Sequence, residues 1–392
     1  MTEKMPPRVR SRGPARAPGR VHWMELFFDL VFVAFVGQLA HGIHGNPGWA
    51  EFGTFVLLFF PAWWAWVNIV SVVNLLPGLS SRSLGMAMLA AMAAAGVMAA
   101  AAPHALGGRA WAFSLANAAM RAILLVLWLY RRRHTGGAAP SWRIWTYNGG
   151  TAALWLVAAA LPLEGAVALW AAAILVEVSM VLVGGRLQPD AGIAGINVEH
   201  AAERLGLFVI IVLGESVFTV VTVVSTVWNP AAWLAGSLGF VVVALLGWAF
   251  FQYGTGTLNA GLERLAGRRD FGGIQLTILF MPFLLVAGVT AIAGAIATAI
   301  PAPFATLPLG SGITLGGGLA LFYLTNAVVS LRFGQSAGAV LPWSIPAVAL
   351  SLLLVPASRA VPAAVVLGLA VVLLLALTAY VELHHRAMAR QG

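Results

Sequence analysis

Long apolar runs recur along this chain of 392 residues. Each run is about 17–25 residues long, the length of helix that crosses about 30 Å of hydrocarbon. We place about twelve of them, at residues 23–43, 51–75, 84–102, 109–130, 142–162, 165–185, 203–226, 231–256, 273–299, 311–331, 341–356 and 361–383. Because backbone polar groups inside a bilayer must be hydrogen-bonded within their own segment, such runs fold as helices. The sequence therefore predicts an all-α fold, a polytopic transmembrane helical bundle.

The composition indicates the same class of protein. Only 9% of the residues are charged and 60% are hydrophobic, whereas soluble domains carry about 25% charged residues. The chain has no cysteine, which excludes disulfides, thiolate metal sites and cysteine nucleophiles. Any chemistry must use histidine, carboxylates, arginine, amides or hydroxyls.

The basic residues predict the orientation in the membrane. All but three of the 22 Lys and Arg residues fall in the N-terminal tail, the C-terminal end or loops on the same side. The exceptions are Arg109 and Arg359 in opposite loops and Arg121 within a helix. By the positive-inside rule we expect a multi-pass protein of the cell (inner or plasma) membrane with both termini cytoplasmic. The basic excess then reflects topology and attraction to the lipid bilayer, and we expect no nucleic-acid partner.

Short matches between the two halves of the chain predict an internal repeat. His22 and Glu25 correspond to His200 and Glu203, and WAWVN at 64–68 corresponds to WAFFQ at 248–252. Six helices in each half would give both copies the same orientation, so the repeats would be parallel. We divide the chain into a disordered basic cytoplasmic tail (1–20), a first six-helix half (21–185), a cytoplasmic linker (186–202) and a second six-helix half (203–392).

Two longer blocks resemble a known family. ELFFDLVF at Glu25–Phe32 and ERLGLFVIIVLGES at Glu203–Ser216 are similar to the recognisable blocks of the bacterial low temperature requirement A (LtrA) family, and WWAWVN at 63–68 also fits. The similarity extends over most of the chain and is weakest in the last three helices. The family name records a growth phenotype in the cold, so the resemblance implies a membrane protein of this type and no particular activity.

A shorter likeness involves the same first block. Residues Phe27–Phe32 are similar to the Phe-Ser-Asp-x-Val-Phe signature in the first helix of a family of six-helix-repeat potassium channels, with Phe28 in place of the Ser. The second half lacks the Asp. This likeness would make Asp29 a residue that anchors its helix.

Three polar residues share one face at the start of the first helix. His22, Glu25 and Asp29 are spaced i, i+3 and i+7. Carboxylates at a helix N-terminus complement the helix dipole, so we interpret His22 with Glu25, and His200 with Glu203, as structural entrance pairs. Asp29 lies about one turn deeper, where an ionised carboxylate needs a partner or water. Two hypotheses stay open for Asp29: an Arg or His partner, or a polar permeation path.

Three further ionisable residues are predicted near the middle of the membrane. Glu215, Glu177 and Arg121 each lie about 12 residues into their helices, roughly 18 Å by helical rise. One hypothesis is a buried network between Arg121 and the carboxylates. The other is that Glu215 or Glu177 changes protonation during transport. Gln38, at the matching depth in the first helix, could supply a neutral hydrogen bond.

No pattern in the sequence points to an enzyme. Cofactor fingerprints, nucleophile elbows and His-Glu-x-x-His helices are missing from the sequence, and its predicted loops are short. His22, Glu25, His200 and Glu203 would suit a metal if they met, but entrance groups explain them better. We therefore expect no metal, no cofactor and no enzymatic activity.

The favoured function is a transporter or channel for a small solute or ion, with proton coupling through Glu215, Glu177 or Asp29 as a hypothesis. The alternative is a membrane protein that does not transport, either an assembly or stress-adaptation factor or an enzyme acting on lipid. The sequence predicts neither the solute nor the oligomeric state.

Overall fold

The computed structural model describes residues 23–76, 81–135, 141–187, 198–268 and 271–389. The predicted tail at 1–20 and most of the predicted linker lie outside these residues. Within them the chain is helical and contains no named β-strand. Eleven of the described helices are long and apolar enough to cross a membrane, so the predicted all-α membrane bundle is confirmed.

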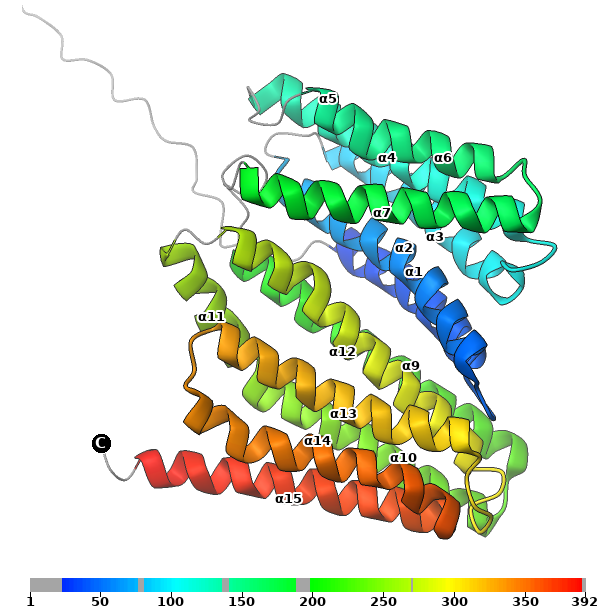
Figure 1. Cartoon of the computed structure of the whole chain (residues 1–392), viewed down its shortest axis with the longest axis vertical. Coiled ribbons are helices and arrows are strands. Elements are labelled where there is room, and N and C mark those ends of the chain that lie inside the picture. Colours follow the sequence, from blue (N-terminus) through cyan, green and yellow to red (C-terminus); the bar gives the residue numbers. More distant parts are fainter. Residues whose placement is uncertain (1–22, 77–80, 136–140, 188–197, 269–270, 390–392) are drawn as a thin grey trace, which may run out of the picture.

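The helices follow one another with short connections (Figure 1). Those of the first half are α1 (Trp23–His41), α2 (Trp49–Asn74), α3 (Ser81–Ala101), the 3₁₀ turn η1 (Ala102–His104), α4 (Ala110–Thr135), α5 (Ser141–Ile144), the π-helical η2 (Trp145–Gly150), α6 (Thr151–Ala158) and α7 (Leu163–Leu187). Those of the second half are α9 (Val198–Val227), α10 (Pro230–Ala249), the π-helical η3 (Phe250–Gly254), α11 (Thr255–Gly267), α12 (Phe271–Ala299), α13 (Leu309–Arg332), α14 (Ala337–Ala360) and α15 (Ala363–Ala389).

Each predicted apolar run corresponds to a helix or to a continuous helical stretch. The fifth run, predicted at 142–162, is the uninterrupted series α5, η2 and α6. It is not among the eleven long spans, and η2 lies in its middle. Single-turn π-helices of this kind are rare and are often found at functional sites.

The eighth run extends beyond its predicted end at 256. The helix continues through η3 into α11, which ends at Gly267. Hydropathy falls in α11 because this helix is amphipathic, with Leu262 and Leu265 packed against Phe333. Arg264 adds a hydrogen bond from Nη1 to the Phe333 carbonyl at 3.2 Å.

The seventh run begins earlier than predicted. α9 starts at Val198 rather than at 203, so His200, Glu203 and Arg204 are all helical residues. Arg204 is buried, with 1% of its surface exposed. Arg204 is therefore not a loop residue, and counting it with the loop Lys and Arg residues that predict the orientation was wrong. The sequence could not show this, because the acids that stabilise the buried Arg204 come from another helix.

Four helix contacts recur in both halves, whereas α2 packs on α4 and its counterpart α10 packs on α15. α1 packs on α3, α3 on α4, α4 on α6 and α6 on α7. Likewise α9 packs on α12, α12 on α13, α13 on α14 and α14 on α15. The predicted repeat would produce this order, although the repeat itself stays a prediction. The halves meet where α1 and α2 contact α9 and α12 (Figure 1). We call the contact between α1 and α9 the α1–α9 seam.

Glycines bring α12, α13 and α14 into backbone contact. A Cβ at Gly318 would lie 2.8 Å from the Gly288 carbonyl oxygen, and a Cβ at Gly288 would lie 2.9 Å from the Gly318 carbonyl oxygen. At Gly316 a Cβ would lie 2.6 Å from the Ser351 carbonyl oxygen. Close approach through small residues is the usual way in which membrane helices gain packing energy. These three helices therefore form a tightly packed wall of the second half.

The substitution Gly318→Ala should destabilise the protein by about 1–3 kcal/mol, because the added methyl group forces α12 and α13 apart. Thermal unfolding in detergent measures the effect. Gly317→Ala is the matched control, since a Cβ there meets only the Ile313 side chain at 3.9 Å. Equal melting temperatures for the two variants would contradict the close packing.

Candidate functional site

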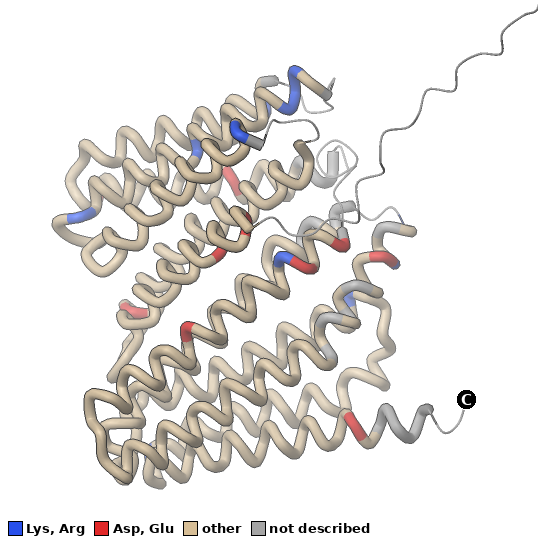
Figure 2. Tube along the Cα trace, turned by 180° about the vertical axis from the view of Figure 1, so that it is seen from behind, with Lys and Arg blue, Asp and Glu red and all other residues tan. Residues whose placement is uncertain are grey.

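Charged residues are sparse along the helices and lie mostly toward the side where the C-terminal helix ends (Figure 2). The candidate residues within the described helices divide into three places. One is the end of the α1–α9 seam nearest the start of α1, the second is the interior of the first half, and the third lies farther along the seam at Glu215.

Asp29 is fully buried at the first of these places and binds an arginine. Arg204 on α9 places Nη2 2.5 Å from the Asp29 Oδ1 atom. Trp66 on α2 donates its indole N–H to the same oxygen at 2.8 Å, and the Arg204 guanidinium lies 5.9 Å from the Trp66 ring. Of the two hypotheses for Asp29, the structure supplies the arginine partner. The Asp29 contacts join α1, α2 and α9.

Glu25 extends this cluster by one turn. Its Oε2 atom lies 3.4 Å from Arg204 Nη1 and 3.2 Å from His200 Nε2. Arg204 also donates to the Glu25 carbonyl oxygen at 3.3 Å. One guanidinium thus contacts two carboxylates across the α1–α9 seam.

The predicted entrance pairs differ from this arrangement. His200 pairs with Glu25 on α1 rather than with Glu203 on its own helix, and Glu203 is exposed. His200 and Arg204 are four residues apart and share the face that meets α1, whereas Glu203 lies on another face. His22 lies outside the described residues. Among the residues that the structure describes, no group of three or more His, Asp or Glu is placed to hold a metal ion.

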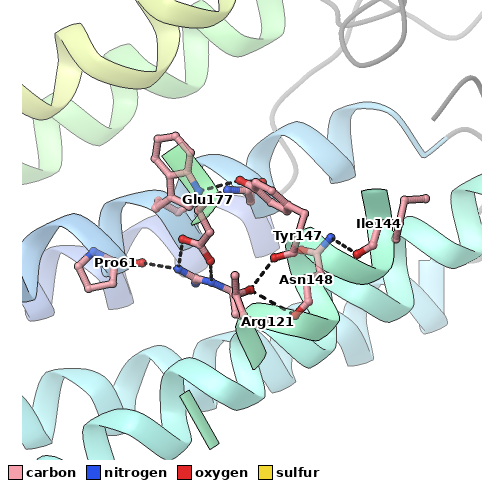
Figure 3. Close-up of polar contacts among 9 residues, drawn as sticks. Pro61, Arg121, Ile144, Tyr147, Asn148 and Glu177 are labelled. Carbon is pink, nitrogen blue, oxygen red and sulfur yellow. Dashed lines mark hydrogen bonds and ion pairs between the residues drawn. The ribbon is translucent and has the colours of Figure 1, made fainter. Parts of the chain in front are cut away.

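The interior of the first half contains a second buried ion pair. Arg121 on α4 places Nε 2.5 Å from Glu177 Oε1 and Nη2 3.0 Å from Glu177 Oε2, and both side chains are at most 1% exposed. Nη2 also donates to the Pro61 carbonyl of α2 at 3.3 Å (Figure 3). This is the fork-to-fork geometry in which arginine binds a carboxylate most strongly. Of the predicted network, Arg121 and Glu177 are in contact and Glu215 is not part of it.

A neutral hydrogen-bond chain next to this pair was missed by the sequence reasoning. Tyr147, in the π-helical η2, accepts a hydrogen bond from Trp64 Nε1 at 2.7 Å and donates to Asn68 Oδ1 at 3.2 Å. Trp64 and Asn68 are four residues apart on α2, so their spacing could have indicated a shared polar face. The chain connects α2 to η2 beside Glu177 (Figure 3).

Glu215 is the acid that the structure leaves without such partners. It is half-buried on α9 and makes no hydrogen bond or ion pair within the described part of the chain. Its carboxylate lies against Gly37 of α1, where a Cβ would collide with Glu215 Oε1. Gln38, the predicted neutral partner, is exposed beside Gly37. Only glycine at position 37 lets a carboxylate approach the α1 backbone this closely.

The end of α1 beyond Gly37 is held by two histidines. His41 bonds through Nδ1 to the Gly37 carbonyl oxygen at 2.8 Å, and its ring stacks on His44 at 5.0 Å. His44 lies in the loop between α1 and α2. Burial, with a smaller contribution from the charge of His41, lowers the pKa of His44 from 6.5 to about 4.

The same loop is fastened to the second half. The Gly45 amide donates to Thr298 Oγ1 of α12 at 2.8 Å, and the Gly310 amide of α13 donates to Asn46 Oδ1 at 2.8 Å. The first half is therefore bound to the second by charges near Arg204 on α9 and by the hydrogen bonds of this loop to α12 and α13.

Comparison with known proteins identifies the family. The family model described as bacterial low temperature requirement A protein (LtrA) matches residues 20–379. The chain belongs to the LtrA family. This confirms the resemblance that Glu25–Phe32 and Glu203–Ser216 carried. The LtrA-family chain is also similar to an uncharacterized protein, RA0937, of Rhizobium meliloti (strain 1021), with 29% identity over 241 residues. That alignment covers 59% of this chain and only 58% of the relative.

The lowered pKa of His44 predicts how stability depends on pH. Below pH 6.5 the unfolded chain takes up a proton at this position, whereas the folded chain does so only near pH 4, so acidification favours unfolding across this interval. We expect His44→Gln to reduce the fall in melting temperature between pH 6.5 and 4. His104→Gln, at an exposed histidine, is the control. An unchanged pH profile in His44→Gln would contradict a buried neutral His44.

Removing one member of the Arg121–Glu177 pair should destabilise the first half by about 3–5 kcal/mol, because the other charge is left buried and unpaired. We expect Arg121→Met and Glu177→Leu each to lower the unfolding free energy. The double variant Arg121→Met with Glu177→Leu should recover most of the loss. Additive effects in this cycle, measured by denaturant titration, would show that the two side chains do not interact.

Proposed function

We propose that this LtrA-family protein moves a small solute or ion across the membrane along the α1–α9 seam, with a proton carried by Glu215. The observation that supports this most directly is the contrast between Glu215 and the other two candidate acids. Asp29 contacts Arg204 and Trp66, and Glu177 contacts Arg121 through both oxygens. Glu215 has no such partner.

A proton carrier must change its charge without disrupting the fold. Neutralising Asp29 or Glu177 would strand a buried guanidinium, at a cost of several kcal/mol. Neutralising Glu215 strands no cation, and it removes a charge from a half-buried position within a membrane helix. Glu215 can therefore alternate between the two protonation states, while Asp29 and Glu177 hold helices together.

The place of Glu215 also suits transport. It lies where the two halves of the chain meet, and in transporters the solute and coupling-ion sites lie between the structural halves. Because α1 and α9 approach each other through Gly37, a small relative movement of the halves would open or close the surroundings of Glu215. The predicted parallel repeat would make α1 and α9 counterparts in this movement.

We propose the orientation from the basic residues alone. Counted without Arg204, the Lys and Arg residues still favour the side of the chain ends, so both termini would be cytoplasmic. The loop with His44 would then face the outside. The α1–α9 cluster around Arg204 would lie at the cytoplasmic end of the seam.

The test is transport by the purified protein in liposomes that contain a trapped pH-sensitive dye. A panel of small cations, amines, amino acids and sugars is added outside, and we expect at least one to cause a proton movement that protein-free liposomes do not show. Glu215→Gln should abolish this movement, because an amide cannot carry a proton.

Glu203→Gln is the matched control, since Glu203 is an exposed acid on the same helix. A wild-type response in Glu215→Gln would contradict the role of Glu215. No proton movement with any solute would favour the alternative of a membrane protein without transport activity.

A further inference from the structure

We propose that His41 relays protons between the outer solution and Glu215. This inference rests on the proposed function and adds the route by which the proton reaches its carrier. Both side chains contact the same residue of α1. Glu215 lies against Gly37, and His41 bonds to the Gly37 carbonyl oxygen at 2.8 Å. His41 is exposed, whereas Glu215 is half-buried.

The hydrogen bond of His41 fixes which ring nitrogen can react. A carbonyl oxygen only accepts hydrogen bonds, so Nδ1 carries the hydrogen and Nε2 of the neutral ring has a free lone pair. Nε2 can take a proton from water to give an imidazolium, and release the same proton to a Glu215 carboxylate oxygen. The ring returns to its starting form, and Glu215 becomes a neutral carboxylic acid. Histidine suits this task because its ordinary pKa is about 6.5.

Other titratable groups near this end of α1 do not compete with His41. His44 stacks on His41 and stays neutral above pH 4, so it does not repel a protonated His41. Glu51 of α2 is engaged by the Gly48 amide at 2.7 Å. The 3₁₀ turn η1, which packs on α1, contributes the exposed His104.

The opposite end of the seam offers no equivalent route. On α1 the buried residues between Asp29 and Gly37 are Phe32, Val33, Phe35 and Val36. On α9 the buried residues between Arg204 and Glu215 are likewise apolar or glycine, namely Leu205, Gly206, Phe208, Val209, Val212 and Leu213. The eleven positions from Arg204 to Glu215 correspond to about 16 Å of helix. Neither helix places a buried proton-carrying side chain within that length, so along α1 and α9 the shorter route to Glu215 begins at His41.

Proton flux itself is the probe. Liposomes with a trapped pH-sensitive dye are given the solute that causes proton movement in the wild type together with an outward-to-inward proton gradient, and potassium with valinomycin holds the membrane potential constant. We expect His41→Ala to slow the protein-dependent flux, and imidazole added to the bath to restore it. Rescue by imidazole distinguishes a relay from a structural role, since a free base can replace a relay but not a packing contact. His104→Ala, at the same end of the molecule, should behave as the wild type, with or without imidazole.

Each result bears on one claim. A wild-type rate in His41→Ala, with Glu215→Gln inactive, would overturn the relay and leave Glu215 as the carrier. The relay would also be overturned if the proton flux of His41→Ala is slow and not restored by imidazole while His41→Gln keeps the wild-type flux. Glutamine preserves a hydrogen bond but cannot titrate, so this result would indicate a structural role. A wild-type rate in Glu215→Gln would instead overturn the proposed function.

Discussion

The free-energy cost of an unpaired charge in hydrocarbon favours two contacts between helices of this protein, α4 with α7 and α1 with α9. Arg121 and Arg204 are the two fully buried cations among the described residues, and each meets a carboxylate from another helix. The Arg121–Glu177 pair joins α4 to α7, and Arg204 joins α9 to α1 through Asp29. Breaking either contact would cost several kcal/mol. These pairs therefore specify lateral neighbours that apolar packing alone would leave interchangeable.

Glu215, unlike Asp29 and Glu177, makes no ion pair with an arginine in the described part of the chain. The proposed function is based on this difference. The glycine at position 37 gives the Glu215 carboxylate a place against the α1 backbone, and no ion pair joins it to an arginine of the described residues. An apolar residue at position 215 would avoid the free-energy cost of placing a carboxylate within a membrane helix. We propose that a proton arrives at and leaves this carboxylate, which lies at the junction of the two halves and shares its neighbour Gly37 with the exposed His41. Asp29, in contrast, contacts Arg204 of α9 and Trp66 of α2.

Depth along a helix was predictable from the sequence, whereas partners across helices were not. Hydropathy and helical rise placed the apolar runs and put Arg121, Glu177 and Glu215 near one level. They could not tell that Glu177 rather than Glu215 pairs with Arg121, because pairing depends on which helices lie side by side. The early start of α9 was missed because Arg204 is polar and its stabilising partners lie far away in sequence. The π-helical η2, which contains Tyr147, could not be predicted, because hydropathy does not distinguish a π-helical turn from the α-helix around it.

The central claim is that Glu215 titrates while Asp29 and Glu177 stay ionised in their pairs. Infrared difference spectra of the purified protein between alkaline and mildly acidic pH report protonated carboxyl groups directly. The account predicts a carboxyl C=O band that disappears in Glu215→Gln and persists in Glu177→Gln and Asp29→Asn. A band that persists in Glu215→Gln but disappears in either of the other two variants would contradict it.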